Sequence, residues 1–183
     1  MKNIILSIGL LFATALSTAQ NVFQASGERS VLRTELPKYT KIDIDSRWEV
    51  TLVNEKNDHI YIDADNAIHP IIKATVEDGT LKISLETPKG VNFVQTGGIK
   101  LKIPIKGTSE LKMQSGKIRS EEPINMPSYK MLLDFLSEID LKLNINDLDL
   151  EIGSCREGNL QLDCRNLTFN AGSLAKPVSY TRL

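Results

Sequence analysis

Four aspartates form two closely spaced pairs in the first half of the chain. Asp43 and Asp45 alternate with isoleucines, and Asp63 and Asp65 lie in a second segment of the same kind. Side chains two residues apart point to the same face of a strand, so each pair lies on one face. If the two strands are neighbours, the four carboxylates have the chemistry to chelate Ca²⁺ or to act as acid and base at a glycosidic bond.

A purely structural role explains the same aspartates without a ligand. The apolar residues between and beside them supply the inward row of half-buried strands: Ile42, Ile44, Ile60 and Ile62. A calcium loop needs closely spaced ligands around a turn-forming glycine, and residues 43–45 contain none. We therefore favour solvent-facing carboxylates, and the sequence assigns no metal site, no cofactor and no catalytic residue.

Trp48 is the only tryptophan in the chain. An exposed tryptophan offers a flat platform for a sugar ring, whereas a lone one between Arg47 and Glu49 also fits a partly buried position. Both interpretations stay open. The candidate ligand-binding residues are Trp48, Asp43, Asp45, Asp63 and Asp65.

The remaining reactive residues form no recognisable catalytic motif. His59 and His69 are the only histidines, and neither stands beside a Gly-x-Ser-x-Gly elbow. Cys155 and Cys164 are nine residues apart and lack metal-ligand spacing. We expect two free, half-buried thiols rather than a disulfide.

Composition excludes one class of partner, and the N-terminus indicates a destination. The 183 residues carry a formal net charge of −1, which provides no basic surface for nucleic acid.

A signal peptide is predicted over residues 1–19. The features that predict it are Lys2, an apolar stretch at residues 4–16 and small residues up to Ala19. We expect an exported protein of the periplasm or cell surface, with no membrane span after signal cleavage.

Alternating apolar residues predict strands throughout the first half of the chain. Asp78-Gly79 separates two such runs and predicts a tight hairpin, because a type I′ turn needs positive φ at both central residues. Gly97-Gly98 predicts a turn before the strand at residues 99–105, and Pro104 places that strand at an edge or beside a bulge. Residues 38–105 are thus expected to form mostly antiparallel or irregular sheet.

The second half repeats itself with a period of about 20 residues. Residues 111–116, 131–137, 148–154 and 167–173 share apolar alternation that ends on small residues. Two short strands per period predict stacked coils, with the small residues at the corners. A β-sandwich predicts similar alternation but does not require small residues at equivalent corners. The residues predicted to face inward are Leu111, Met113, Leu133, Phe135, Leu148, Leu150, Leu160, Leu162, Leu167 and Phe169.

These segments resemble the "putative auto-transporter adhesin, head GIN domain" family, a domain of unknown function in secreted Bacteroidota proteins. The matching features are Tyr-Thr-Lys-Ile-Asp-Ile-Asp at residues 39–45, the hairpin at 76–84, Ile-Lys-Leu-Lys-Ile-Pro at 99–104, and the corners. The family's Gly-Ser-Gly corner is reduced here to Ser115-Gly116, Ser137, Gly153-Ser154 and Gly172-Ser173. The resemblance implies an all-β, right-handed β-helix (β-solenoid) domain at residues 38–178, between an N-terminal extension (20–37) and a tail (179–183). It carries over no catalytic residue.

The sequence as a whole favours a non-catalytic, adhesion-type binding protein. A short β-coil fills its interior with apolar side chains, so affinity would come from a flat β-face presented to a glycan or protein at the cell envelope. Unpaired edges at the coil ends also favour self-association. The alternative is a carbohydrate-active β-helix enzyme that acts on acidic polysaccharide.

Overall fold

The protein is built almost entirely from β-strands. The structure, a computed structural model, describes residues 21–174 and 179–182, and its only helical segment is the 3₁₀ turn His69–Ile71. The prediction of an all-β fold is therefore confirmed. The predicted signal peptide, residues 1–19, lies outside the described residues.

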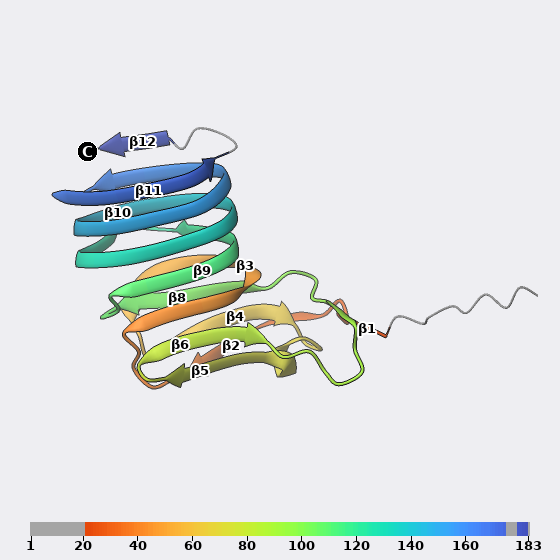
Figure 1. Cartoon of the computed structure of the whole chain (residues 1–183). Coiled ribbons are helices and arrows are strands. Elements are labelled where there is room, and N and C mark those ends of the chain that lie inside the picture. The colour runs from red at the N-terminus through yellow and green to blue at the C-terminus, as the bar shows by residue number, and fades with distance from the viewer. Residues whose placement is uncertain (1–20, 175–178, 183) are drawn as a thin grey trace, which may run out of the picture.

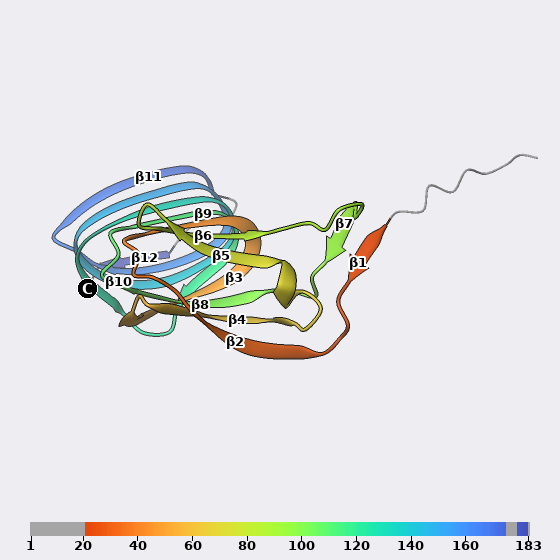
Figure 2. The ribbon, with the colours of Figure 1, turned by 90° about the horizontal axis from the view of Figure 1, so that it is seen from below.

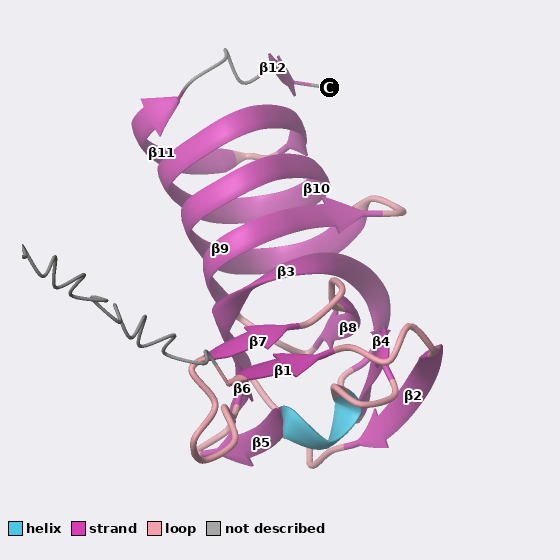
Figure 3. Cartoon of the chain, turned by 90° about the vertical axis from the view of Figure 1, so that its right-hand side faces the viewer, coloured by secondary structure: helices cyan, strands magenta, loops and turns pink. Residues whose placement is uncertain are grey.

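The strands of the C-terminal half wind into stacked circuits, which we call coils (Figures 1 and 3). They follow β3 (Lys41–Lys56) and comprise β9 (Glu110–Ser120), β10 (Ile124–Asp163) and β11 (Asn166–Leu174), all paired in parallel. The register pairs apolar residues of neighbouring strands with one another. Ile42 is the partner of Leu111, and Leu111 is the partner of Met131. Each coil therefore covers the inward row of the one before it.

The long strand β10 completes two successive coils. Its first part pairs with β9, and its later part pairs with β11 and with β12 (Ser179–Arg182). Polar side chains 19 residues apart join the two coils: Asn144 donates to Asn125 at 3.1 Å, and Asn159 donates to Asp140 at 2.9 Å. The repeat of about 20 residues predicted from the sequence is thus one circuit of the chain.

The N-terminal half is less antiparallel than predicted. Antiparallel pairs join β2 (Arg29–Glu35) to β4 (His59–Asp65), β4 to β8 (Lys100–Lys106), and β5 (Ile72–Glu77) to β6 (Thr80–Leu85). By contrast, β3 pairs in parallel with β6, β8 and β9. The stack therefore begins at Lys41 rather than Leu111. Alternation of side chains is the same in both pairings, so it does not reveal strand direction.

Local turn signals were interpreted correctly from the sequence. Asp78 and Gly79 have φ of 49° and 73°, which closes the β5–β6 hairpin as predicted. Gly97 and Gly98 also have positive φ and form a bend before β8. Beside the coils, β1 (Val22–Gln24) and β7 (Phe93–Gln95) make a separate two-stranded sheet (Figure 2). Residues 20–37 and 179–183 thus contribute the paired strands β1, β2 and β12.

Pro104 lies at an irregularity and not at a sheet edge. Strand β8 lies between β3 and β4, so of the two positions predicted for Pro104, an edge or a bulge, the structure shows the irregular one. Pro104 faces Val53, and the β3–β8 register shifts between Val53 and Lys56. Strand β4 pairs only with residues 100–102 of β8. The Pro104 nitrogen carries no hydrogen and could not donate to β4, and at this position no such hydrogen bond is needed.

The predicted inward row is largely correct, with three exceptions. Leu111, Met113, Leu133, Leu148, Leu150, Leu160 and Leu162 are all at most 3% exposed. Phe135 is 68% exposed because it occupies the outward position of a corner, and Leu136 behind it is buried instead. Phe169 is 43% exposed and Leu167 is half-buried, although they pair with buried Leu150 and Leu148. No described strand covers the other side of β11.

Candidate functional site

The two acidic pairs do not come together in the structure. Strand β8 separates β3, which carries Asp43, from β4, which carries Asp63. Asp43 is half-buried between Lys82 and Lys112 of the neighbouring strands, and Asp63 forms an ion pair with Arg29 at 2.9 Å. Four carboxylates around one ligand would require adjacent strands, and the topology does not provide them.

Asp65 is buried and organises the turn that precedes β2. Its carboxylate accepts hydrogen bonds from the Ser26 nitrogen and hydroxyl, at 2.9 and 2.8 Å, and from the nitrogens of Gly27 and Ala67, at 2.7 and 2.9 Å. Burial alone would raise the pKa of Asp65, but these donors outweigh it and lower the pKa to about 2. The carboxylate is thus committed to internal hydrogen bonds.

Trp48 packs in the core and is 5% exposed, whereas Asp45 on the same strand is exposed. The Trp48 backbone lies against Gly116 of β9, its partner in the parallel register. Little of the indole face is therefore available to a sugar ring.

The histidines serve local structure. His69 Nε2 lies 3.0 Å from the Ser30 carbonyl oxygen and 3.2 Å from the Ser30 hydroxyl. A carbonyl oxygen only accepts hydrogen bonds, so Nε2 carries the proton in this contact and is not available as a base toward the hydroxyl. His59 is buried, and its Nδ1 lies 2.6 Å from an Asp58 carboxylate oxygen.

Neither cysteine is bridged or exposed. Cys155 and Cys164 are free and at most 9% exposed, and the Cys155 thiol donates to the Glu157 carbonyl oxygen at 3.0 Å. Burial raises the pKa of Cys155. Among the described residues, no three His, Cys, Asp or Glu side chains are placed to hold a metal ion, and no helix is long and apolar enough to cross a membrane.

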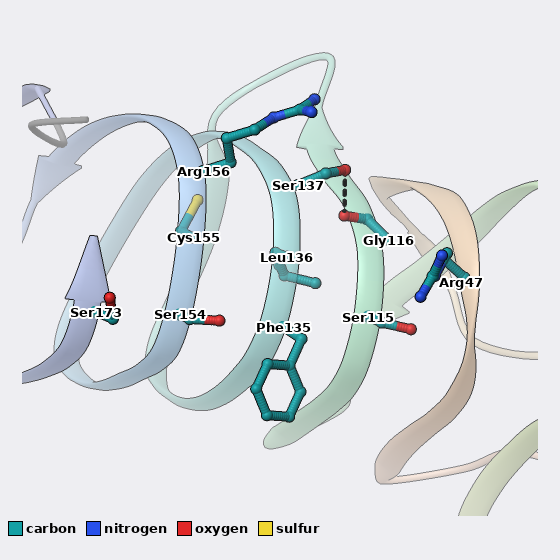
Figure 4. Close-up of a pocket in the computed structure, with 10 residues that line it drawn as sticks. All are labelled: Arg47, Ser115, Gly116, Phe135, Leu136, Ser137, Ser154, Cys155, Arg156 and Ser173. Atoms are coloured by element: carbon teal, nitrogen blue, oxygen red, sulfur yellow. Dashed lines mark hydrogen bonds between the residues drawn. The ribbon is translucent and has the colours of Figure 1, made fainter. Parts of the chain in front are cut away.

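The most prominent outward feature is a row of corner residues at the same position on successive coils (Figure 4). In the parallel register, Arg47 is the partner of Ser115, Ser115 is the partner of Phe135, and Ser154 is the partner of Ser173. We call these five residues the corner row. Small side chains at three of the five positions leave a groove of about 400 Å³, whose lining also includes Ser137 and Arg156.

The groove continues toward the N-terminal strands. An adjoining hollow of about 470 Å³ shares Arg47, Gly116 and Ser137 with it and reaches Lys100. At the junction, the Ser137 hydroxyl donates to the Gly116 carbonyl oxygen at 2.9 Å (Figure 4). We call the groove and this hollow together the corner groove.

Glycines let neighbouring strands approach closely at the corners of the coils. Gly116 has φ of +116°, and a β-carbon there would overlap the Trp48 backbone. A β-carbon on Gly172 would overlap the Gly153 carbonyl oxygen of the neighbouring coil. Both positions therefore require glycine for packing, which explains the small corner residues noted in the sequence.

Positive charge along the corner groove is only partly neutralised. Lys117 pairs with Glu138 at 2.8 Å, which raises the pKa of Lys117. Arg47, Lys100 and Arg156 are exposed and form no ion pair with a described residue. Figure 4 shows Arg156 extending across the adjacent coil toward Ser137. The groove is suited to hold an anionic group by charge and hydrogen bonding.

The repeat in the sequence predicts where the corners lie, but not which residues give them chemical character. It predicts Phe135 in the core and gives no reason to select Arg47 or Arg156 as ligand-binding residues. The available signal was a substitution within the repeat: Phe135 stands where Ser115, Ser154 and Ser173 stand in the other coils.

An all-β chain of stacked parallel coils with an open groove is an architecture of binding proteins as well as enzymes. Residues 38–176 match the family described as "Putative auto-transporter adhesin, head GIN domain". This chain belongs to that family, as the resemblance of its segments indicated. No curated protein matches the sequence.

Solved structures of similar fold come from Parabacteroides and Bacteroides species. A putative adhesin from Parabacteroides merdae is 17% identical with a TM-score of 0.51, over 79% of this chain and 64% of that one. A putative lipid binding protein from Parabacteroides distasonis is 17% identical with a TM-score of 0.59, over 84% and 65%. A putative adhesin from Bacteroides fragilis is 12% identical with a TM-score of 0.53, over 87% and 100%. The match thus spans under two thirds of the first two chains.

Proposed function

We propose that this chain is a non-catalytic binding protein of the adhesion type, which presents a flat face of its stacked coils to a glycan or protein at the cell envelope. The corner groove carries the proposal, because it is open to solvent and crosses successive coils. The family description and the adhesin names of the Parabacteroides and Bacteroides proteins support a binding role. Flat faces of stacked repeats suit extended partners.

We infer that the stacked coils form a right-handed β-helix, closed around the apolar row. The parallel register between β3, β9, β10 and β11 supports this architecture. A rigid stack of this kind holds its surface residues at fixed spacing, so little ordering entropy is lost when a partner binds.

The predicted signal peptide and the adhesin relatives support export to the periplasm or the cell surface. Protease treatment of intact cells distinguishes these locations. Degradation of the protein would indicate surface exposure and a role in adhesion, whereas protection until the outer envelope is opened would indicate a periplasmic binding role.

The competing function is cleavage of acidic polysaccharide. Purified protein incubated with a panel of polysaccharides and matrix proteins should bind at least one of them without releasing reducing or unsaturated sugar ends. Release of such ends, abolished by Asp43→Asn, Asp45→Asn or Asp63→Asn in variants whose melting temperature is unchanged, would establish the enzyme instead.

Self-association through β11 is part of the same proposal. The outer edge of β11 pairs with no described strand, and residues 166–173 carry none of the charges that usually protect an edge. Light scattering should detect dimers that Asn170→Lys converts to monomers. A wild-type protein that stays monomeric at high concentration would contradict this part.

A further inference from the structure

We propose that the corner groove binds a carboxylated polysaccharide that lies across the coils, held by Arg47, Lys100 and Arg156 and stacked on Phe135. This inference rests on the proposed function and specifies its partner as an acidic glycan. The argument comes from charge, geometry and the exposed aromatic ring.

Charge selects an anionic partner. Among the described residues that line the corner groove, only Glu49 carries a carboxylate, and it lies 3.7 Å from the Arg119 guanidinium. Arg47 and Arg156 form no ion pair with a described residue, and neither does Lys100, whose register partners are Glu49 and Asp63. Unpaired cations along a groove raise the local concentration of anions. Guanidinium groups, planar and forked, match a carboxylate in two parallel hydrogen bonds.

The corner groove is elongated and open to solvent, and it does not enclose a ligand as a pocket does. Its corner row crosses five consecutive passes of the chain, two of them made by β10, which at a strand spacing of about 4.8 Å gives a length of about 19 Å. Serine hydroxyls recur on the row at Ser115, Ser154 and Ser173 (Figure 4). A linear polymer with a regular repeat of hydroxyl and carboxylate groups can use such a track along its whole length.

Phe135 favours a sugar over a smaller anion. It is 68% exposed in the middle of the corner row, where three of the other four positions carry serine. An exposed ring costs solvation free energy unless something covers it, and its flat face suits the C–H face of a pyranose. Arg47 and Arg156 line the same groove as Phe135, so carboxylate contacts are available to a polymer that stacks one sugar on the ring.

An anionic membrane and a nucleic acid offer the same charge but fit less well. Within the described residues, the groove exposes one large apolar side chain, which provides little area for lipid insertion. The whole chain has a net charge of −1, which works against a phosphate backbone. Both serve as test ligands.

The test measures binding of the purified protein to polygalacturonate by titration calorimetry, with neutral dextran, anionic phospholipid vesicles and single-stranded DNA alongside. Arg47→Gln/Arg156→Gln should weaken polygalacturonate binding about tenfold at low salt, and Phe135→Ala several-fold. The matched control is Lys56→Gln/Lys106→Gln, which removes the same charge from exposed residues outside the groove and should leave affinity unchanged. Unchanged melting temperatures show that the variants are folded.

Several outcomes would overturn the inference. Equal losses in the groove and control variants would mean nonspecific charge attraction. Tighter binding to vesicles or DNA would identify a different partner class. Binding only to dextran or to a protein would refute an acidic glycan as the partner but would leave the proposed binding function intact. Release of sugar ends would refute the binding function itself.

Discussion

Gly116 lies directly against the backbone of Trp48 in the neighbouring strand. A β-carbon on Gly116 would lie 2.7 Å from the Trp48 nitrogen and still closer to its carbonyl oxygen, and the φ of Gly116 is +116°. This approach joins the N-terminal strand β3 to the first repeat strand β9 at the corner. It therefore fixes both the packing of Trp48 and the floor of the corner groove.

Gly116→Ala should lower the free energy of unfolding by about 2–5 kcal/mol, because backbone strain and overlap add together. Chemical denaturation measures the loss. Gly90→Ala is the matched control: Gly90 also has positive φ, at +78°, but a β-carbon there meets nothing within 4 Å. Equal losses at the two positions would show that the contact with Trp48 has no part in the effect.

Leu150 and Phe135 should respond differently to truncation, although the sequence predicted both to face inward. Leu150 is fully buried, so Leu150→Ala should cost about 2–5 kcal/mol. Phe135 is exposed at a corner, so Phe135→Ala should change stability by less than about 0.5 kcal/mol. Urea denaturation of both variants checks the assignment, and a large loss for Phe135→Ala would contradict the outward position.

Acid should weaken the fold through Asp65. Its pKa is about 2 in the folded protein against an ordinary value of 3.8, so its contribution to stability is complete above pH 4 and is lost as pH falls toward 2. Asp65→Asn should lower the melting temperature at pH 7 and flatten its dependence on pH in that window. Exposed Asp45 provides the control, and Asp45→Asn should change neither quantity.

Cys155 should react slowly with iodoacetamide at pH 8. Burial raises the pKa of this thiol and shields it, so both the thiolate fraction and access are reduced. Peptide mass spectrometry should show little alkylation of Cys155 until the protein is unfolded in guanidinium chloride. Rapid alkylation of the folded protein, or a peptide in which Cys155 and Cys164 are cross-linked, would contradict the buried, free thiols.

Local signals in the sequence predicted particular elements well. Positive φ at Asp78 and Gly79 follows from the chemistry of an Asp-Gly turn, and the burial of Leu148, Leu150 and Leu160 follows from alternation within the repeat. These features depend on residues close together in the chain, so their causes can be recognised without knowing the fold.

The candidate site was less predictable, because it depends on which strands are neighbours. The sequence placed Asp43 and Asp63 on similar strands, but the insertion of β8 between β3 and β4 separates them. Arg47 and Arg156, more than a hundred residues apart, line one groove because parallel register brings their corners to the same side of the stack.

By itself, the sequence determined the all-β class, the repeat of about 20 residues and most of the apolar row, because local periodicity selects strands and marks their buried face. It indicated the family through the resemblance of particular segments, among them residues 39–45, 76–84 and 99–104. Only the tertiary structure decided that β3 pairs in parallel, that Phe135 points outward and that Trp48 is buried. A strand's side-chain alternation is the same in either pairing direction, and at a corner the outward side depends on how the chain bends against its neighbours.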